Sequence, residues 1–228
     1  MDSQPISTPI TAPRGFVICH AVRTATMLQV VVVSLAVIVA TSAVAWDGTV
    51  PGWEADITTF INDWPDWLEP AMWALQQVGV LFAPVVAGLI IAWSARRWIY
   101  LVPFVLVLPL KLGIEKGLVK QLVERERPFT SLGPEIEVRG TEYEGLAFPS
   151  GHTTTAFALA ILVCAFLPPK WRPIPIVWAF IVAVARIYYG EHNLLDVFAG
   201  AALGTAFAVF LWWAFLNRHV HPDCECAT

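Results

Sequence analysis

Three short motifs in the second half of the chain carry residue types that handle phosphate groups. KQLVERERP places two cations seven residues apart, FPSGHTTT puts a histidine after a serine and a glycine, and ARIYYGEHNLLDVFAG spaces an arginine, a histidine and an aspartate. Cations bind phosphate oxygens, and a histidine backed by a carboxylate can act as a nucleophile. The residues concerned are Lys120, Arg127, Ser150, Gly151, His152, Arg186, His192 and Asp196.

The third motif has the spacing of an oriented nucleophile. On a helix, residues four apart share a face, so we expect the Asp196 carboxylate to accept a hydrogen bond from one ring nitrogen of His192. That bond would leave the other nitrogen with its lone pair and would stabilise the cation formed when this nitrogen attacks. Arg186 lies near the end of the preceding apolar run. The alternative is a buried histidine–aspartate pair that only closes a helix end.

The first two motifs supply binding groups. If one helix continues from Lys120 to Arg127, seven residues bring both cations to nearly the same face; the alternative is a basic cluster that reaches lipid head groups. Ser150 is a candidate N-cap, and Gly151 leaves the backbone N–H groups at the helix start open to an anion. The alternative there is an ordinary capped helix with an interfacial His152.

Together these groups favour phosphoryl transfer. Lys120, Arg127 and Arg186 can stabilise the oxygens of a phosphate in its transition state, while the two histidines provide a nucleophile and an acid. A two-metal mechanism would need several converging carboxylates, and no metal site is predicted. The acidic candidates near the motifs are Asp196, Glu124, Glu126 and Glu191.

The elements that must position these motifs are membrane-spanning helices. Of the 228 residues, 57% are hydrophobic and 14% are charged, and the mean hydropathy of +0.64 is too high for an ordinary soluble domain. About 20 helical residues cross a bilayer. The predicted fold class is therefore all-α, a bundle of six transmembrane helices. The apolar runs, of which the last three fit less cleanly, cover residues 27–46, 70–94, 98–119, 150–168, 174–190 and 194–216.

The charges give this bundle an orientation. Lys and Arg flank alternate ends of the spans, whereas the connection 47–69 carries acidic residues and no Lys or Arg. The positive-inside rule then puts both termini in the cytoplasm, and all three motifs meet at the outer membrane face. The predicted organisation is a disordered cytoplasmic tail at 1–25, a six-span domain at 26–216 and a cytoplasmic tail at 217–228. The segment 56–67 is expected to lie flat on the outer surface.

Two features near the ends leave alternatives open. The first apolar run, with Arg23 before it and Ala43 and Ala45 at its end, resembles a cleaved secretory signal, although its length and long polar lead favour a retained anchor. Cys224 and Cys226 have histidines nearby and could hold a metal, but a short tail without one is favoured. The cysteines lie in the tails or within a span, so no external disulfide framework is expected.

The three motifs resemble the signatures of the type 2 phosphatidic acid phosphatase (PAP2) family. The match consists of K-x6-RP ending at Pro128, PSGH ending at His152, and R-x5-H-x3-D ending at Asp196. It covers about residues 120–200, and the six-span plan is similar to the integral-membrane branch of the family. The family often has a serine where this chain has Ala185. That difference removes a supporting hydrogen bond and leaves the core roles unchanged.

The resemblance implies a role for each residue. His192 is the expected nucleophile, which forms a phosphohistidine, and Asp196 orients it. His152 is expected to protonate the leaving group and later to activate water. No metal or other cofactor is implied. The residues expected to hold the phosphoryl oxygens are Lys120, Arg127, Ser150, Gly151 and Arg186.

The expected function is that of a metal-independent lipid phosphatase in a bacterial plasma membrane. The substrate favoured by family analogy is a polyprenyl (undecaprenyl or decaprenyl) pyrophosphate. Phosphatidylglycerophosphate, phosphatidic acid and a polyprenyl-phosphate sugar phosphate are alternatives. A phosphotransferase with the same intermediate and a lipid binder without catalysis also fit the motifs. The expected partners are the lipid phosphate and the bilayer, with no nucleic acid, and the oligomeric state is left open.

Overall fold

The apolar stretches of the chain form helices, because a backbone in a bilayer must satisfy its own hydrogen bonds. The computed structural model describes residues 18, 20–46, 48–139 and 145–220. Within these ranges there is no β-strand, only an isolated bridge between Ile18 and Val220. The all-α prediction is confirmed. The α-helices are α1 (Thr24–Ala45), α2 (Gly52–Asn62), α3 (Glu69–Gln76), α4 (Ala83–Ala95), α5 (Leu101–Leu110), α6 (Lys120–Val123), α7 (Pro128–Ser131), α8 (Gly151–Cys164), α9 (Pro173–Tyr188) and α10 (Leu194–Leu211).

Four helical stretches in the described part of the chain are long and apolar enough to cross a membrane. A fifth span would combine Asp66–Gly79 with Ala83–Ala95, which meet at a bend of 66°. α8 is apolar but has only 14 residues, fewer than a bilayer requires. The runs expected at 70–94 and 150–168 are therefore not single long helices, and the count of six spans stays a prediction. The four stretches are Thr24–Ala45, Trp98–Ser131, Pro169–Tyr188 and Leu194–His219.

Glycine and proline explain where the two shorter segments break. The chain bends between Gly79 and Pro84, and Pro84 has no backbone N–H to continue a helix. A Cβ at Gly79 would lie 2.8 Å from the His152 carbonyl oxygen, so the bend packs directly against the start of α8. α8 in turn ends at Cys164, and the prolines Pro168 and Pro169 that follow have no backbone N–H with which to resume the helix.

The third apolar run is continuous but is not a uniform α-helix. α5 contains Pro109, which cannot donate a backbone hydrogen bond, and the following segment η4 (Lys111–Val119) is a π-helix. α6 completes the run and ends at Val123. Glu124 then adopts a left-handed conformation with φ +49°, which turns the chain away from the helix axis.

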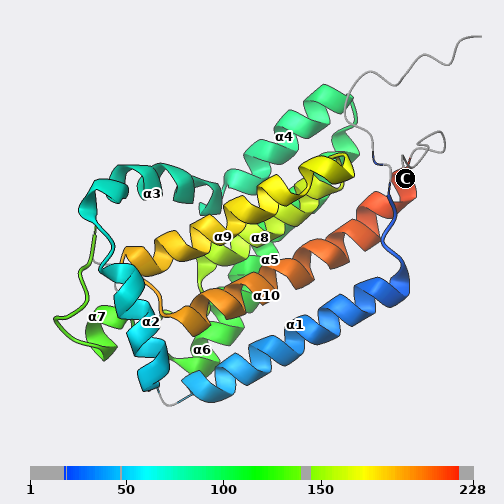
Figure 1. The fold of residues 1–228 in the computed structure, drawn as a ribbon. Coiled ribbons are helices and arrows are strands. Elements are labelled where there is room, and N and C mark those ends of the chain that lie inside the picture. Colours follow the sequence, from blue (N-terminus) through cyan, green and yellow to red (C-terminus); the bar gives the residue numbers. More distant parts are fainter. Residues whose placement is uncertain (1–17, 19, 47, 140–144, 221–228) are drawn as a thin grey trace, which may run out of the picture.

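α8 is the central helix of the bundle. It packs on both α9 and α10, and α10 packs in turn on α1 (Figure 1). The short helices α2, α3, α6 and α7 gather at one end, whereas Ile18 and Val220 pair at the other. The described ends of the chain therefore lie together, opposite the end where α8 and α10 begin.

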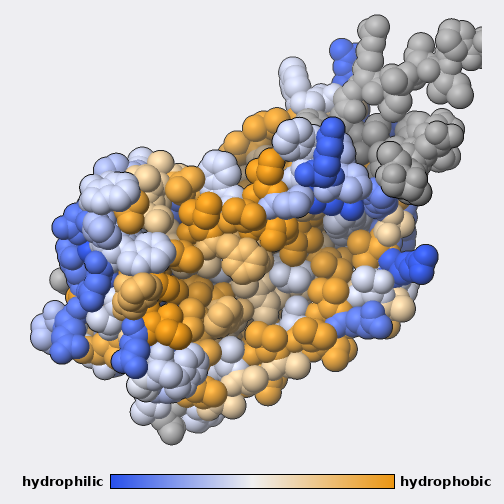
Figure 2. Space-filling view, in the orientation of Figure 1, coloured by the Kyte–Doolittle hydropathy of each residue, from blue (hydrophilic) through white to orange (hydrophobic). Residues whose placement is uncertain are grey.

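Apolar side chains cover the middle of the surface in Figure 2, and hydrophilic residues lie towards its two ends. On α1, for example, Val32 and Val39 are 62% and 66% exposed. A soluble monomer rarely exposes so large a continuous apolar surface. This distribution is that of an integral membrane protein.

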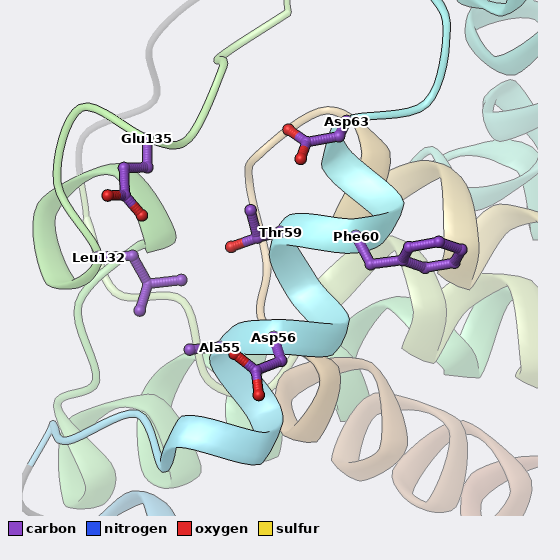
Figure 3. Close-up of a pocket in the computed structure, with 7 residues that line it drawn as sticks. All are labelled: Ala55, Asp56, Thr59, Phe60, Asp63, Leu132 and Glu135. Carbon is purple, nitrogen blue, oxygen red and sulfur yellow. The ribbon is translucent and has the colours of Figure 1, made fainter.

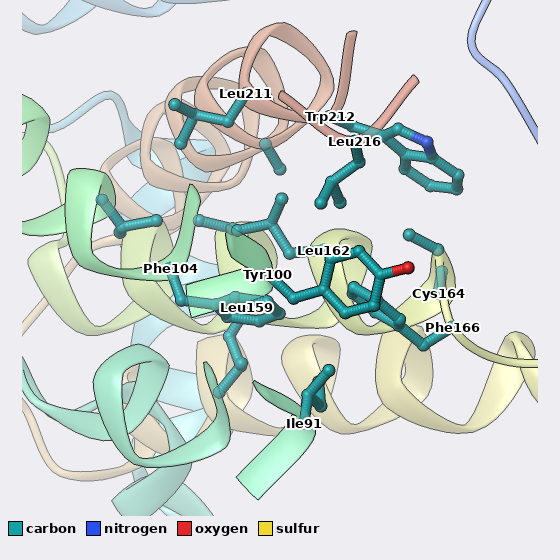
Figure 4. Close-up of a cluster of buried hydrophobic side chains, with 14 of the residues drawn as sticks. Ile91, Tyr100, Phe104, Leu159, Leu162, Cys164, Phe166, Leu211, Trp212 and Leu216 are labelled. Atoms are coloured by element: carbon teal, nitrogen blue, oxygen red, sulfur yellow. The ribbon is translucent and has the colours of Figure 1, made fainter. Parts of the chain in front are cut away.

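The largest cluster of buried apolar side chains holds α4, α5, α8 and the end of α10 together (Figure 4). The rings of Tyr100 and Phe104 pack against Phe166, with centroids 5.1 and 6.2 Å apart. Trp212 and Leu216 cover this cluster from the end of the last helix. Because the cluster uses the last turns of α8, it fixes the helices in the half of the bundle away from the motifs.

Two glycines bring α8 and α10 into close contact near the motifs. A Cβ at Gly200 would lie 2.6 Å from the Ser150 carbonyl oxygen, and one at Gly204 would lie 2.2 Å from the Thr154 carbonyl oxygen. Small residues four apart allow helix backbones to approach closely within a membrane. This crossing sets the distance between the PSGH motif and the start of α10.

Gly204→Ala is expected to destabilise the protein by about 1–3 kcal/mol, because the added methyl group meets a backbone carbonyl that cannot rotate away. Thermal unfolding in detergent, followed by tryptophan fluorescence, measures the effect as a lower melting temperature. Gly113→Ala is the matched control, since nothing lies within 4 Å of a Cβ at that position. Equal melting temperatures for the two variants would contradict the close crossing.

Candidate active site

Hydrogen bonds join the three sequence motifs at the end of the bundle where α8 and α10 begin. Each pair of motifs is connected by at least one direct bond, so the predicted site residues are brought together. The bonds run from the Lys120 ammonium to the Pro149 carbonyl (3.0 Å), from the Ser150 N–H to the Asp196 carbonyl (2.9 Å) and from Arg127 Nη1 to the Glu191 carbonyl (3.0 Å).

His192 and Asp196 face each other, but they do not share a helix. α10 begins at Leu194 with Asn193 as its N-cap, so His192 precedes the helix. His192 Nδ1 lies 3.6 Å from Asp196 Oδ2, too far for a hydrogen bond. The same oxygen accepts the Asn193 N–H at 2.8 Å. The predicted helical hydrogen bond is therefore wrong, although the predicted proximity is confirmed.

The surroundings of His192 keep its imidazole uncharged. Burial lowers the pKa of His192 well below its usual value, and the positive charges of Arg186, Arg127 and Lys120 lower it further. A backbone hydrogen bond at Ala147 opposes this shift. At neutral pH the ring therefore has a lone pair on one nitrogen, as a nucleophile requires.

The two cations of the first motif reach the site by different routes. Lys120 begins α6, whereas Arg127 follows the left-handed Glu124 in an extended conformation with φ −76° and ψ 157°. The condition that one helix continues from Lys120 to Arg127 is not met, because α6 ends at Val123. The reversal at Glu124 nevertheless brings Arg127 to the carbonyl of Glu191.

The PSGH motif forms the start of α8 with Ser150 at the N-cap position, as predicted. Ser150 has extended N-cap backbone angles and makes no capping hydrogen bond; its Oγ accepts a bond from the Thr153 hydroxyl at 3.0 Å. Gly151 has a packing role that the sequence did not reveal, since a Cβ there would lie 3.0 Å from Glu115 Oε1. His152 is half-buried on the first turn.

Arg186 is only 3% exposed and is held by two groups that sequence reasoning did not assign to the site. It pairs with Gln76 Oε1 from α3 and with Glu191 Oε2. Glu191 Oε2 also lies 3.5 Å from Arg127 Nη1. The position of Glu191 next to His192 could have indicated that Glu191 belongs to the site. Nothing local in the sequence connects Gln76 with Arg186.

A buried ion network supports Asp196, and sequence reasoning missed it. Arg125 Nη1 donates to Asp196 Oδ1 at 2.9 Å, and Arg125 Nη2 donates to Glu54 Oε2 at 2.6 Å. Glu54 Oε1 also accepts the Leu195 N–H at 2.8 Å. All three charged side chains are fully buried. The place of Arg125 between Lys120 and Arg127 could have indicated that it belongs to the site. Glu54 could not be identified in this way, because in the sequence it is one of several acidic residues of an external connection.

α2 supplies Glu54 because it turns its polar face inward. Glu54, Thr58 and Asn62 are fully buried, whereas Ile57 and Phe60 on the same helix are 39% and 68% exposed. A helix that exposes its apolar face is suited to lie against lipid. The expected position of the segment 56–67 on the outer surface stays a prediction. The carboxylate of Glu54 is the group by which α2 reaches the site.

Arg125→Met is expected to cost about 3–5 kcal/mol of stability, because it leaves two buried carboxylates without their cation. The predicted result is a large fall in melting temperature in detergent. Arg97→Met is the control, since Arg97 is exposed and lies just after the C-terminal end of α4. If both variants melted like the parent protein, Arg125 would not be the partner on which these carboxylates depend.

An acidic pocket at this end of the molecule is unsuited to phosphate. An open pocket of about 420 Å³ lies between α2 and the segment that follows α7 (Figure 3). Its carboxylates repel an anion, so it is not the candidate site. The lining residues are Ala55, Asp56, Thr59, Phe60, Asp63, Leu132 and Glu135.

Metal-ligating groups of three or more His, Cys, Asp or Glu side chains are not found in the described part of the chain. The alternative metal site at Cys224 and Cys226 lies outside the described residues. His219, one of the two histidines near those cysteines, has its ring centroid 6.1 Å from that of Tyr100.

The helical membrane fold and the joined motifs define the class of PAP2-type phosphatases. The sequence matches the PAP2 superfamily over residues 98–219, and the chain belongs to this superfamily. The match begins before α5 and includes all three motifs, so it covers the whole of the proposed phosphate site.

Several known proteins are similar to this chain. The bacitracin transport permease protein BcrC of Bacillus licheniformis is 29% identical over 163 residues, which cover 69% of this chain and 78% of that protein. The undecaprenyl-diphosphatase of Sulfolobus acidocaldarius is 32% identical over 144 residues, which cover 61% of this chain and 63% of that protein. The chain thus matches slightly less than two thirds of the second relative.

A solved structure shares the fold. The crystal structure of a transmembrane PAP2-type phosphatidylglycerolphosphate phosphatase from Bacillus subtilis aligns with 86% of this chain and 98% of its own. The TM-score is 0.64 and the sequence identity is 21%. The helical arrangement described above is therefore that of a transmembrane PAP2 protein.

Proposed function

We propose that the protein hydrolyses the phosphate or diphosphate group of a membrane lipid through a phosphohistidine at His192. The observation that carries this proposal is the meeting of a buried, uncharged imidazole with three cations, Lys120, Arg127 and Arg186, where the three motifs join. Membership of the PAP2 superfamily supports phosphatase chemistry.

In the first step, the lone pair on His192 Nε2 attacks phosphorus, and the bond from phosphorus to the leaving oxygen breaks. Nδ1 keeps its proton, and a small rotation closes the 3.6 Å gap to Asp196 Oδ2 as the ring becomes positive. Asp196 thereby fixes the tautomer and stabilises the cation. His152, on the first turn of α8, is proposed to protonate the leaving oxygen, the role that the PAP2 resemblance gives it.

In the second step, water attacks phosphorus and the phosphorus–nitrogen bond breaks, which restores the neutral His192. His152 has lost its proton in the first step, so it can accept one from the attacking water. Inorganic phosphate then leaves. If an alcohol attacked in place of water, the phosphoryl group would pass from His192 to that alcohol. The protein would then be a phosphotransferase, which is the second candidate function.

The phosphoryl oxygens are proposed to bind Lys120, Arg127 and Arg186, together with Ser150 and Gly151 at the start of α8. The N–H groups of the first turn of a helix attract anions. Direct anchors support this arrangement, because Lys120 is held by the Pro149 carbonyl at 3.0 Å and Arg127 by the Glu191 carbonyl at 3.0 Å. Cations fixed before the reaction stabilise a developing charge without reorganisation.

The proposed substrate is a polyprenyl diphosphate, by analogy with the undecaprenyl-diphosphatase relative. Glycerolipid phosphates such as phosphatidylglycerophosphate and phosphatidic acid are the alternatives. The position of the site at the end of the bundle supports a lipid whose tail stays in the bilayer while its phosphate meets the cations. The charge pattern supports an outward-facing site in a bacterial plasma membrane, with both termini in the cytoplasm.

His192→Ala is expected to reduce the rate of phosphate release by about 10³-fold or more, because it removes the nucleophile. Asp196→Asn is expected to lower kcat and to leave KM nearly unchanged, because Asp196 orients the imidazole for the chemical step. His219→Ala is the control, as this histidine contacts Tyr100 away from the motifs. Parental turnover in the His192→Ala protein would contradict the role of His192 as the nucleophile.

A phosphate-release assay in detergent with EDTA is expected to show turnover of at least one lipid phosphate. The panel contains a polyprenyl diphosphate, phosphatidic acid and phosphatidylglycerophosphate, and the first is expected to have the highest kcat/KM. Loss of all activity on adding EDTA would overturn the metal-independent mechanism. Turnover that requires an alcohol acceptor and releases no phosphate would identify a phosphotransferase.

A further inference from the structure

The carboxylate of Glu191 lies between the two arginines that are proposed to bind phosphate. Its Oε2 pairs with Arg186 Nη2 and lies 3.5 Å from Arg127 Nη1. All three side chains are largely buried, with exposed fractions of 6% for Glu191, 4% for Arg186 and 13% for Arg127. A carboxylate presents two oxygens to guanidinium groups much as a phosphate does.

The backbone of Glu191 is fixed, so only its side chain is able to leave the arginines. The Glu191 N–H donates to the Arg186 carbonyl at 3.2 Å, and the Glu191 carbonyl accepts from Arg127 at 3.0 Å. Gly190 has φ +69° and lies so close to the Glu137 carbonyl that a Cβ would be 2.6 Å from it. Rotation about the side-chain bonds of Glu191 is therefore the motion that opens the arginine pair.

The arginines have anchors that do not depend on this carboxylate. Arg186 also bonds Gln76 Oε1, and Arg127 also donates to the backbone carbonyl of Glu191. Removing the charge of Glu191 leaves both of these anchors in place. The carboxylate therefore neutralises part of the positive charge of the site without being the sole support of either arginine.

We propose that Glu191 is an internal competitor that occupies the phosphate site until a substrate phosphate displaces it. This inference rests on the proposed function for the identity of the site and adds the control of its affinity. A dianionic phosphate or a diphosphate brings more charge to the arginines than one carboxylate, so it displaces Glu191. After the reaction, the carboxylate competes with inorganic phosphate for the arginines. Its return to them favours release of the phosphate.

Glu191→Gln removes the charge while keeping the size of the side chain. The inhibition constant of inorganic phosphate is expected to fall about tenfold, since the arginines lose a charge-assisted competitor. Equilibrium binding of radiolabelled inorganic phosphate to the purified protein in detergent is expected to tighten by the same factor. The KM for lipid substrate falls as well, and kcat falls where phosphate release limits turnover.

Glu137→Gln is the matched control. Glu137 Oε2 forms a similar carboxylate–arginine pair with Arg139 Nη2 at 2.7 Å, but its side chain is 60% exposed. Phosphate binding by Glu137→Gln is expected to equal that of the parent protein. Glu191→Asp, which retains the charge, is expected to stay near the parent affinity.

Unchanged or weaker phosphate binding in Glu191→Gln would overturn the inference and make Glu191 a support for the arginines. Should Glu191→Gln fail to fold, Glu191→Asp and Glu191→Ala take its place, and equal tightening in both would show that charge is not the cause. The binding assay needs no turnover. Tighter binding in a protein that releases phosphate from no lipid would therefore sustain the inference and refute the proposed function.

Discussion

The pairing of Asp196 with Arg125 is the interaction on which the rest of the site depends. Asp196 is fully buried at the start of α10, where an unpaired charge would be costly. Arg125 occupies one carboxylate oxygen, and the Asn193 N–H binds the other, which faces His192. Both carboxylate oxygens are therefore held in place beside the imidazole. Glu54 completes the arrangement by balancing the charge of Arg125.

Helix packing delivers these groups to one place. The glycines of α10 allow α8 to approach closely, and the Ser150 N–H reaches the Asp196 carbonyl as a result. The short helices at the same end contribute single side chains, Glu54 from α2 and Gln76 from α3, to the motifs of the longer helices. The apolar packing is concentrated at the opposite end of the bundle. At the motif end, the buried polar side chains form hydrogen bonds and ion pairs with one another.

The sequence predicted those parts of the site that depend on local spacing. Hydropathy predicted the all-α membrane fold, and the charge pattern and motif order predicted that the three motifs would meet. Extrapolation along an ideal helix failed at Glu124 and at His192, because local pattern does not show a left-handed residue or the exact N-cap. Glu54 and Gln76 were missed because their partners lie 71 and 110 residues away, and no spacing rule connects such distant residues.

Trapping the phosphorylated protein tests the central claim most directly. A rapid-mixing experiment with a lipid labelled in its terminal phosphate, quenched in alkali, preserves a phosphorus–nitrogen bond. The account predicts protein-bound label in the first turnover, located on the peptide that contains His192 and missing from the His192→Ala protein. Phosphate release without labelled protein under these conditions, or label on another residue, would contradict a phosphohistidine at His192.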